Sequence, residues 1–229
     1  MDYRTLKSAF IVTIPVLLGY LAIGVAFGLL LETAGYPWFI APVMSILIYA
    51  GAAQYIAVGL FSSSAGLLDV AIVTLLVNAR HMVYGLSLLG KFKKTGPYKP
   101  YLVFALTDET YALLTSVKPP PDVQPTRFYF AVSILDQSYW VIGSIIGALL
   151  GSLVHFNTKG LDFALTALFI VLLIEQTRAV PRVLPYSTAL TCGILALIFF
   201  PQNMLIAAIA ASVSVLLIAR GVFNYDARA

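Results

Sequence analysis

Ala50-Gly51-Ala52-Ala53-Gln54-Tyr55 and Asn78-Ala79-Arg80-His81-Met82-Val83-Tyr84 are the two runs that decide the fold of this chain. Both lie inside the stretch 36–94, in segments that are otherwise apolar enough for lipid. Each nevertheless carries groups that need hydrogen bonds, and lipid offers no partner for them. A helix that faces only lipid has no use for an amide, a guanidinium or an imidazole. The two runs therefore predict helices that line a path for a solute.

Composition places the whole chain in a membrane. Of its 229 residues, 60% are hydrophobic and only 10% are charged, with a mean hydropathy of +0.93. A soluble domain carries about 25% charged residues. The apolar residues come in runs of about 20, the length that crosses a hydrocarbon core of ~30 Å as a helix. We expect an all-α polytopic membrane protein with about seven to eight transmembrane helices, in a single membrane domain over residues 1–229.

The apolar segments, numbered one to eight in chain order, are separated by short polar connections. They are expected at residues 8–31, 38–61, 66–90, 101–117, 128–154, 161–176, 187–200 and 203–220. Pro119-Pro120-Pro121 begins a stiff extended linker between the hydrophobic halves 8–117 and 128–220. Segments one and five both carry spaced glycines. The halves are therefore either duplicated, as in many secondary transporters, or unrelated.

The distribution of basic residues contradicts a simple arrangement of eight spans. With both chain ends in the cytoplasm, such an arrangement puts Lys91, Lys93, Lys94 and Lys99 outside, against the rule that cytoplasmic loops are basic. Inverting the protein exposes a larger basic set outside. One of the first three segments is therefore expected to be broken or re-entrant. Segment two at Gly51 and segment one at Pro15 are the candidates, because irregular backbone at membrane depth needs protein or water around it and proline interrupts helical hydrogen bonding.

Spaced glycines predict close helix packing. Gly24 and Gly28 are four residues apart in segment one, and Gly143, Gly147 and Gly151 repeat the same spacing in segment five. Glycines at this spacing let two helix backbones approach closely in lipid. The contact is expected either inside this chain or against a partner, which includes a second copy in an oligomer.

Two carboxyl groups stand at the centre of segment four. Asp108 and Glu109 are adjacent, so on a helix their side chains point about 100° apart. Ionisable groups at membrane depth are costly and mark functional sites by default. We expect Asp108 and Glu109 to take part in proton coupling. The alternative is that one of them pairs with Arg80 and has only a structural role.

The opening runs supply the candidates for substrate binding, namely Gly51, Gln54, Asn78, Arg80 and Tyr84. Gln54 and the exposed backbone at Gly51 can receive the head group of a small zwitterion, and Arg80 can clamp its carboxylate. Asn78, His81 and Tyr84 form one polar stripe. For Gln54 the alternative is an interhelical hydrogen bond, and for the stripe it is a structural role. His81 is either responsive to pH or simply hydrogen-bonded.

At these residues the chain resembles the AzlC family, the large subunits of branched-chain amino acid permeases. The likeness covers roughly residues 8–220, and its most specific parts are the two opening runs. The features that carry it are Pro15 with Gly24-x-x-x-Gly28, Met44-Ser45 before Ala50–Gln54, Asn78-x-Arg80-His81-x-x-Tyr84, Thr107-Asp108-Glu109, Trp140-x-x-Gly143 and Leu161-Asp162-Phe163-Ala164. The resemblance implies export of leucine, isoleucine, valine and related apolar amino acids across a bacterial inner membrane. It also implies a small membrane subunit of the AzlD family as partner.

The leading functional hypothesis is thus a proton-coupled secondary transporter that works by alternating access. No ATP-binding motif is present, and no cofactor, metal or nucleic acid is expected. A membrane scaffold or a channel subunit without carrier activity is the alternative. An intramembrane enzyme is disfavoured because the chain has neither G-x-S-x-G nor H-E-x-x-H.

Overall fold

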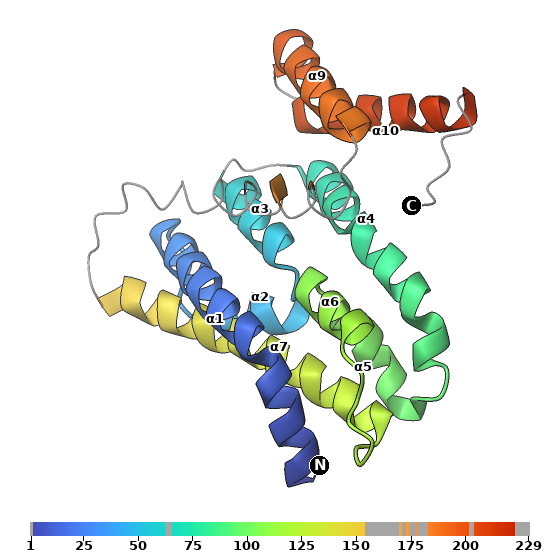
Figure 1. The fold of residues 1–229 in the computed structure, drawn as a ribbon. Coiled ribbons are helices and arrows are strands. Elements are labelled where there is room, and N and C mark those ends of the chain that lie inside the picture. Colours follow the sequence, from blue (N-terminus) through green and yellow to red (C-terminus); the bar gives the residue numbers. More distant parts are fainter. Residues whose placement is uncertain are drawn as a thin grey trace. The chain divides into compact units, whose positions relative to one another are not determined.

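The computed structural model describes residues 2–62, 66–153, 170, 173–174, 177, 183–201 and 204–222, and every element in these ranges is a helix (Figure 1). This confirms the all-α class. The elements are α1 (Tyr3–Thr33), α2 (Ile40–Leu47), α3 (Gly51–Ser62), α4 (Leu67–Phe92), the 3₁₀ turn η1 (Gly96–Tyr98), α5 (Lys99–Phe104), α6 (Asp108–Ser116), α7 (Pro125–Leu153), α9 (Val183–Phe199) and α10 (Met204–Val222).

Within this part of the chain, three helices are long and apolar enough to cross a membrane, namely α1, α4 and α7. Shorter apolar helices lie at Gly51–Phe61, Val183–Phe199 and Ala207–Ala219. A count of seven to eight spans stays a prediction, as do the single domain and the duplicated halves. Most of segment six, including Leu161 to Ala164, lies outside the described residues.

The helices fall into two compact units. The first comprises 1–65 and 77–169, and therefore holds α1–α3, most of α4 and α5–α7. The second comprises 66–76 and 170–229, and in it α9 packs against α10. All polar groups singled out by the sequence lie in the first unit.

Helices α1 and α7 form the central pair of the first unit, and they run in the same direction. Gly24 faces the backbone at Trp140 to Ser144, and Gly28 faces Ser144 to Ala148. Later residues of α1 thus contact later residues of α7, as in a parallel pair. A Cβ on Gly147 would overlap the carbonyl of Val25, and one on Gly143 would stand 3.0 Å from the carbonyl oxygen of Tyr20. Further along, Gly151 lies against the side chain of Glu32. The spaced glycines thus meet inside this chain.

Segment two is interrupted at residues 48–50, between α2 and α3. Tyr49 has a φ of +44°, in the left-handed region that a bulky side chain seldom adopts. Helix α2 packs on α7, where Ser45 bonds Ser144 and Gln137 donates to the Ile46 carbonyl. Helix α3 turns back toward the end of α1, where Phe61 packs on Tyr36. We call α2–α3 the first return hairpin. Helix α1, by contrast, continues through Pro15.

Segment four is also interrupted, so the expectation of one continuous helix over 101–117 is wrong. Helix α5 ends at Phe104, and Thr107 begins α6 by accepting a hydrogen bond from the Thr110 amide. Helix α5 follows the direction of α7, because Tyr98 packs on Phe130 while Tyr101 bonds Gln137. Helix α6 then runs parallel to α4, because Arg80 contacts Asp108 at the start of α6 and Lys91 contacts the Leu114 carbonyl near its end. We call α5–α6 the second return hairpin.

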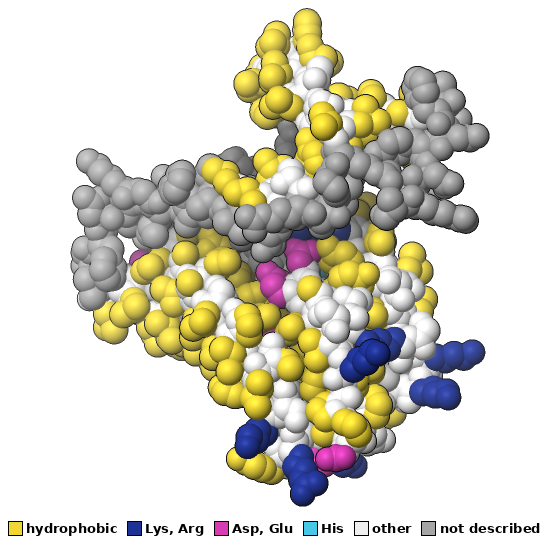
Figure 2. Space-filling view, in the orientation of Figure 1, with side chains coloured by type: hydrophobic (Ala, Val, Ile, Leu, Met, Phe, Trp, Pro, Cys, Tyr) yellow, Lys and Arg dark blue, Asp and Glu magenta, His cyan; other side chains and the backbone are white. Residues whose placement is uncertain are grey.

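The two return hairpins bring the basic connections of the first unit to one end. Phe92, at the end of α4, packs on Tyr129 at the start of α7. The start of α1 lies at this end too, because Asp2 feels the charge of Arg127. Figure 2 shows lysine and arginine side chains gathered over this end. The basic residues concerned are Arg4, Lys7, Lys91, Lys93, Lys94, Lys99, Lys118 and Arg127. A return hairpin that does not cross the membrane leaves the chain on the same side, so this arrangement predicts that the basic connections of the first unit all lie in the cytoplasm.

The sidedness can be tested with single cysteines in a Cys192→Ser background. We expect Lys7→Cys, Lys93→Cys and Asp122→Cys to react with an impermeant maleimide from the cytoplasmic side. Trp38→Cys, which lies between α1 and α2, should react only from the opposite side. Labelling of intact cells and of inverted vesicles measures this directly. If Lys7 and Lys93 label from opposite sides, α2–α3 crosses the membrane and the return hairpin is wrong.

The α1–α7 contact predicts a strong effect of one methyl group. Gly147→Ala forces the two backbones apart, and overpacking of this kind costs about 1–3 kcal/mol. Gly19→Ala is the matched control, because a Cβ there meets nothing within 4 Å. Thermal unfolding in detergent should show a lowered midpoint for Gly147→Ala and no lowering for Gly19→Ala. Equal midpoints would show that the contact contributes little.

Candidate functional site

A cavity lies where the two return hairpins meet. Its volume is about 190 Å³, well above the ~10–15 Å³ that a single water needs. The turn between α2 and α3 forms one wall of the cavity, and the residues between α5 and α6 form another. Helix α4 forms the remaining wall. The lining residues are Ile48, Tyr49, Ala50, Asn78, His81, Phe104 and Leu106. The rings of Tyr49 and Phe104 approach across it, with centroids 6.4 Å apart.

The interrupted backbone gives this cavity a polar character. The last carbonyls of a helix and its first amides have no partner inside the helix, and they carry partial charges of opposite sign. Helix α2 ends and α3 begins at Ile48 to Gly51, while α5 ends and α6 begins at Phe104 to Asp108. Carbonyl ends and amide ends therefore meet in one place. Such ends are the groups with which broken helices bind charged solutes in membranes.

On α4, the Arg80 guanidinium is paired with Asp108. Nη1 of Arg80 lies 2.6 Å from Oδ2 of Asp108, and the side chains are 33% and 24% exposed. The Tyr84 hydroxyl donates to Oδ1 of the same carboxylate at 2.5 Å. Nε of Arg80 is buried without a hydrogen-bond partner. Arg80 thus neutralises Asp108 and still has a donor to offer.

Asn78 and His81 bring the polar stripe of α4 to the cavity. Oδ1 of Asn78 is buried and has no hydrogen-bond partner. The His81 ring stands edge-on to Tyr84, with centroids 5.8 Å apart. On the opposite side of the helix, Met82 and Val83 are exposed. The stripe therefore faces protein, as a polar stripe on a membrane helix should.

Gly51 and Gln54 lie in a separate cluster around Trp140. Gln54 is fully buried, accepts a hydrogen bond from the Trp140 indole at 2.9 Å and donates to the Ser45 hydroxyl at 3.1 Å. Gly51 lies against the same indole, where a Cβ would stand 3.1 Å from the ring. All this matches the alternative of an interhelical hydrogen bond for Gln54. The sequence-predicted site residues thus form two sets, with Asn78, Arg80, Tyr84 and Asp108 together and Gln54 apart. Gly51 lies between them, because it contacts Trp140 and also follows Ala50, which lines the cavity.

Glu109 and a third carboxyl group, Asp136, belong to a network inside the first unit. The Tyr20 hydroxyl lies 2.7 Å from Oε2 of Glu109 and 2.6 Å from the Thr107 hydroxyl. Thr110 donates to Oδ2 of Asp136 at 2.8 Å, and Asp136 is completely buried. The sequence alone assigned no role to Asp136. The Asp136-Gln137 pair inside an apolar segment was the available signal for a site.

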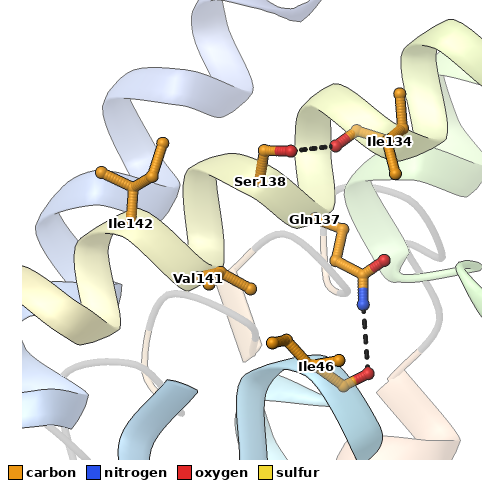
Figure 3. A pocket seen from close by; sticks show the side chains of 6 residues that line it. All are labelled: Ile46, Ile134, Gln137, Ser138, Val141 and Ile142. Atoms are coloured by element: carbon orange, nitrogen blue, oxygen red, sulfur yellow. Dashed lines mark hydrogen bonds between the residues drawn. The ribbon is translucent and has the colours of Figure 1, made fainter. Parts of the chain in front are cut away.

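A larger hollow of about 420 Å³ lies between α2 and α7, beside Ile46, Ile134, Gln137, Ser138, Val141 and Ile142 (Figure 3). Its polar groups are already occupied. Gln137 donates to the Ile46 carbonyl at 3.2 Å and accepts from Tyr101, while the Ser138 hydroxyl donates to the Ile134 carbonyl. A charged head group would find no partner there, so the smaller cavity is the better candidate. In the described part of the chain no cluster of three His, Cys, Asp or Glu residues is placed to hold a metal.

Interrupted helices that meet at a polar cavity are typical of membrane transport proteins. The family model described as AzlC protein matches residues 15–154. A branched-chain amino acid transport protein of Bacillus subtilis, AzlC, is 37% identical over 204 residues, which are 89% of this chain and 80% of that protein. The chain belongs to the AzlC family.

Other relatives are also membrane proteins. An uncharacterised membrane protein of Helicobacter pylori is 49% identical over 175 residues, covering 76% of this chain and 77% of its own length. The inner membrane protein YgaZ of Escherichia coli is 28% identical over 143 residues, covering 61% and 58%. No solved structure matches the chain.

The Arg80–Asp108 pair predicts a non-additive pair of substitutions. Arg80→Ala leaves the Asp108 charge without its cation, which in this partly exposed position should cost about 1–2 kcal/mol of stability. Arg80→Ala combined with Asp108→Asn removes both charges and should recover much of that loss. Thermal unfolding in detergent measures the cycle, with the loop variant Lys94→Ala as control. Additive losses in the double variant would mean that the pair does not couple.

Proposed function

We propose that this chain is a secondary transporter that exports branched-chain or other hydrophobic amino acids across the bacterial inner membrane. Export is coupled to protons and requires a small AzlD-type membrane subunit. The observation that carries the proposal is the cavity at the meeting of the two return hairpins. It combines unpaired polar groups with an apolar wall, which is what an apolar amino acid demands. The printed name of the Bacillus subtilis relative supports the substrate class.

The head group of the amino acid would bind at the polar side of this cavity. Its carboxylate suits the amide end of α3 at Gly51, because helix N-termini attract anions. The unused Nε of Arg80 suits the same carboxylate. Its ammonium group suits the unpaired Oδ1 of Asn78 together with the carbonyl end of α5. Ile48, Phe104 and Leu106 then receive the branched side chain.

Tyr84 and Gln54 would hold this site in shape. Tyr84 orients the Asp108 carboxylate through its hydrogen bond, and Gln54 fixes the start of α3 against Trp140. Both groups act on substrate binding through their neighbours.

The Arg80–Asp108 pair suggests how substrate and proton are coupled. A substrate carboxylate competes with Asp108 for the same guanidinium. When Arg80 turns to the substrate, Asp108 loses its cation and can take a proton instead. Glu109 follows Asp108 on α6 and is hydrogen-bonded to Tyr20. It would supply or receive that proton. One amino acid bound thus corresponds to one proton moved within the site.

Flux of labelled valine and leucine in proteoliposomes, with and without the small subunit, tests the proposal. We expect saturable transport that responds to a pH gradient. Arg80→Lys, which loses the guanidinium fork, should raise the KM by about 10-fold or more, since one hydrogen bond to a charged group contributes ~1.5–3 kcal/mol. Asp108→Asn and Glu109→Gln should uncouple transport from the pH gradient, and Lys93→Ala should change neither property.

Three results would contradict the proposal. Flux that fails to saturate indicates a channel. Flux of other solutes alone indicates a different substrate class. Coupling that survives in the Asp108→Asn and Glu109→Gln double variant removes the role of these carboxyl groups.

A further inference from the structure

Asp136 is a buried carboxyl group without a cation. Its side chain is completely inaccessible to solvent. The ion pair found among the described residues joins Arg80 to Asp108 and does not include Asp136. Thr110 donates to Oδ2, but Oδ1 has no hydrogen-bond partner. An isolated carboxylate is too costly to keep charged in such a place, and a proton is the cation that neutralises it most cheaply.

Two further hydroxyl groups near Asp136 are buried and unpaired. One belongs to Ser133, one turn earlier on α7, and the other to Tyr49 at the turn of the first return hairpin. Tyr49 is electrostatically coupled to Asp136. A protonated carboxyl group has both a donor and an acceptor, whereas a carboxylate has acceptors only. A protonated Asp136 can therefore donate a hydrogen bond, which the carboxylate cannot.

A chain of hydroxyl groups joins Asp136 to Glu109. Thr110 donates to Asp136 at 2.8 Å, Thr107 donates to Thr110 at 3.1 Å, and the Tyr20 hydroxyl bonds Thr107 at 2.6 Å. Tyr20 also lies 2.7 Å from Oε2 of Glu109. The three hydroxyl residues are buried, so water does not compete for their hydrogen bonds.

We propose that Asp136 is a proton-binding site and exchanges its proton with Glu109 through Tyr20, Thr107 and Thr110. Glu109 gives a proton to the Tyr20 oxygen, Tyr20 passes its own to Thr107, Thr107 passes its own to Thr110, and Thr110 passes its own to Oδ2 of Asp136. Each hydroxyl ends neutral with one hydrogen, so the net change is one proton moved from Glu109 to Asp136. The reverse transfer follows the same bonds. The importance of this route for transport rests on the proposed function, whereas proton binding by Asp136 does not.

The titratable groups that face Asp136 favour this role. Glu109 on α6 acts on it as a like charge. Tyr49 from the first return hairpin and Tyr101 from α5 are coupled to it as well. Tyr139 on α7 is the remaining phenol, and its hydroxyl bonds Thr13 rather than the chain. Helix α1 contributes Tyr20, which contacts Glu109.

Infrared difference spectroscopy of the purified protein at low and high pH tests the site without transport. We expect a protonated-carboxyl stretching band in the wild type that disappears as the pH rises. The Asp136 component of this band should be lost in Asp136→Asn at every pH and should persist in Asp108→Asn and in Glu109→Gln, which removes the other carboxyl group of the route. Ser133→Ala, which keeps the carboxyl group, should retain the band at a shifted frequency and guards against a folding defect in Asp136→Asn. A band that is unchanged in folded Asp136→Asn, or no band in the wild type, overturns the site.

The hydroxyl route is tested by comparing two kinds of flux in proteoliposomes. Exchange of labelled for unlabelled leucine at equal pH needs no net proton movement, whereas accumulation driven by a pH gradient does. Tyr20→Phe and Thr110→Val should slow the driven accumulation by about 10-fold or more and leave exchange near the wild-type rate. Tyr139→Phe is the matched control, because it removes a buried phenol hydroxyl that does not belong to the hydrogen-bonded route. It should change neither the driven accumulation nor the exchange.

The outcomes separate the two proposals. Failure of both exchange and accumulation in the wild type contradicts the proposed transport function, while the infrared band still decides whether Asp136 binds a proton. If Tyr20→Phe and Thr110→Val behave like Tyr139→Phe, the hydroxyl route is wrong even where the band titrates at Asp136.

Discussion

The contact between the backbones of α1 and α7 is the constraint on which the rest of the first unit depends. Gly24 and Gly28 meet Gly143 and Gly147 without intervening side chains, so the two helices form one narrow rigid pair. Lipid provides no hydrophobic force between helices, and close packing of this kind is what holds them together. Trp140, one turn before Gly143, is thereby fixed against Tyr20 and Phe27.

From this pair the polar interior is built outward. The Trp140 indole fixes Gln54, Gln54 fixes Ser45, and Ser45 returns to Ser144 on α7. The first return hairpin is therefore anchored on both of its helices. The second is anchored differently, by Asp108 on Arg80 of α4 and by Thr110 on Asp136 of α7. Buried polar groups satisfied in this way favour one arrangement of helices over others. The cavity is thus bordered by a hydrogen-bonded anchor on one side and an ionic anchor on the other.

Much of this architecture is readable in the sequence, for identifiable reasons. Apolar runs of membrane length predict helices, glycines four residues apart predict a close contact, and the basic residues around Lys93 reveal that simple spans fail. That conflict predicts a break at either Gly51 or Pro15, and the break lies next to Gly51. The second interruption has only a local signal, a threonine followed by two acidic residues, which is typical of a helix start. Because the surrounding segment is apolar, it was read as one span.

The internal networks are harder to predict, because their members are distant in sequence. Tyr20 and Thr107 are 87 positions apart, and Trp140 and Gln54 are 86 apart. A single sequence shows that Asp136 and Gln54 are polar groups at depth. It does not show which hydroxyl or indole each one meets, since that depends on how the return hairpins seat against α7. For the same reason the sequence grouped Gln54 with Arg80, although the structure places Gln54 against Trp140 and Ser45.

The parallel course of α1 and α7 has a consequence for how the protein is made. The number of membrane crossings decides on which face of the membrane each later segment emerges, and a hairpin that returns to the face where it started adds none. Among the described helices between α1 and α7, α4 is the one long and apolar enough to cross the membrane. Residues can thus be added to or lost from either hairpin without inverting anything downstream. The regions that carry the candidate binding groups, Tyr49 to Gly51 and Phe104 to Asp108, are therefore free to diverge while the orientation of the chain stays constant.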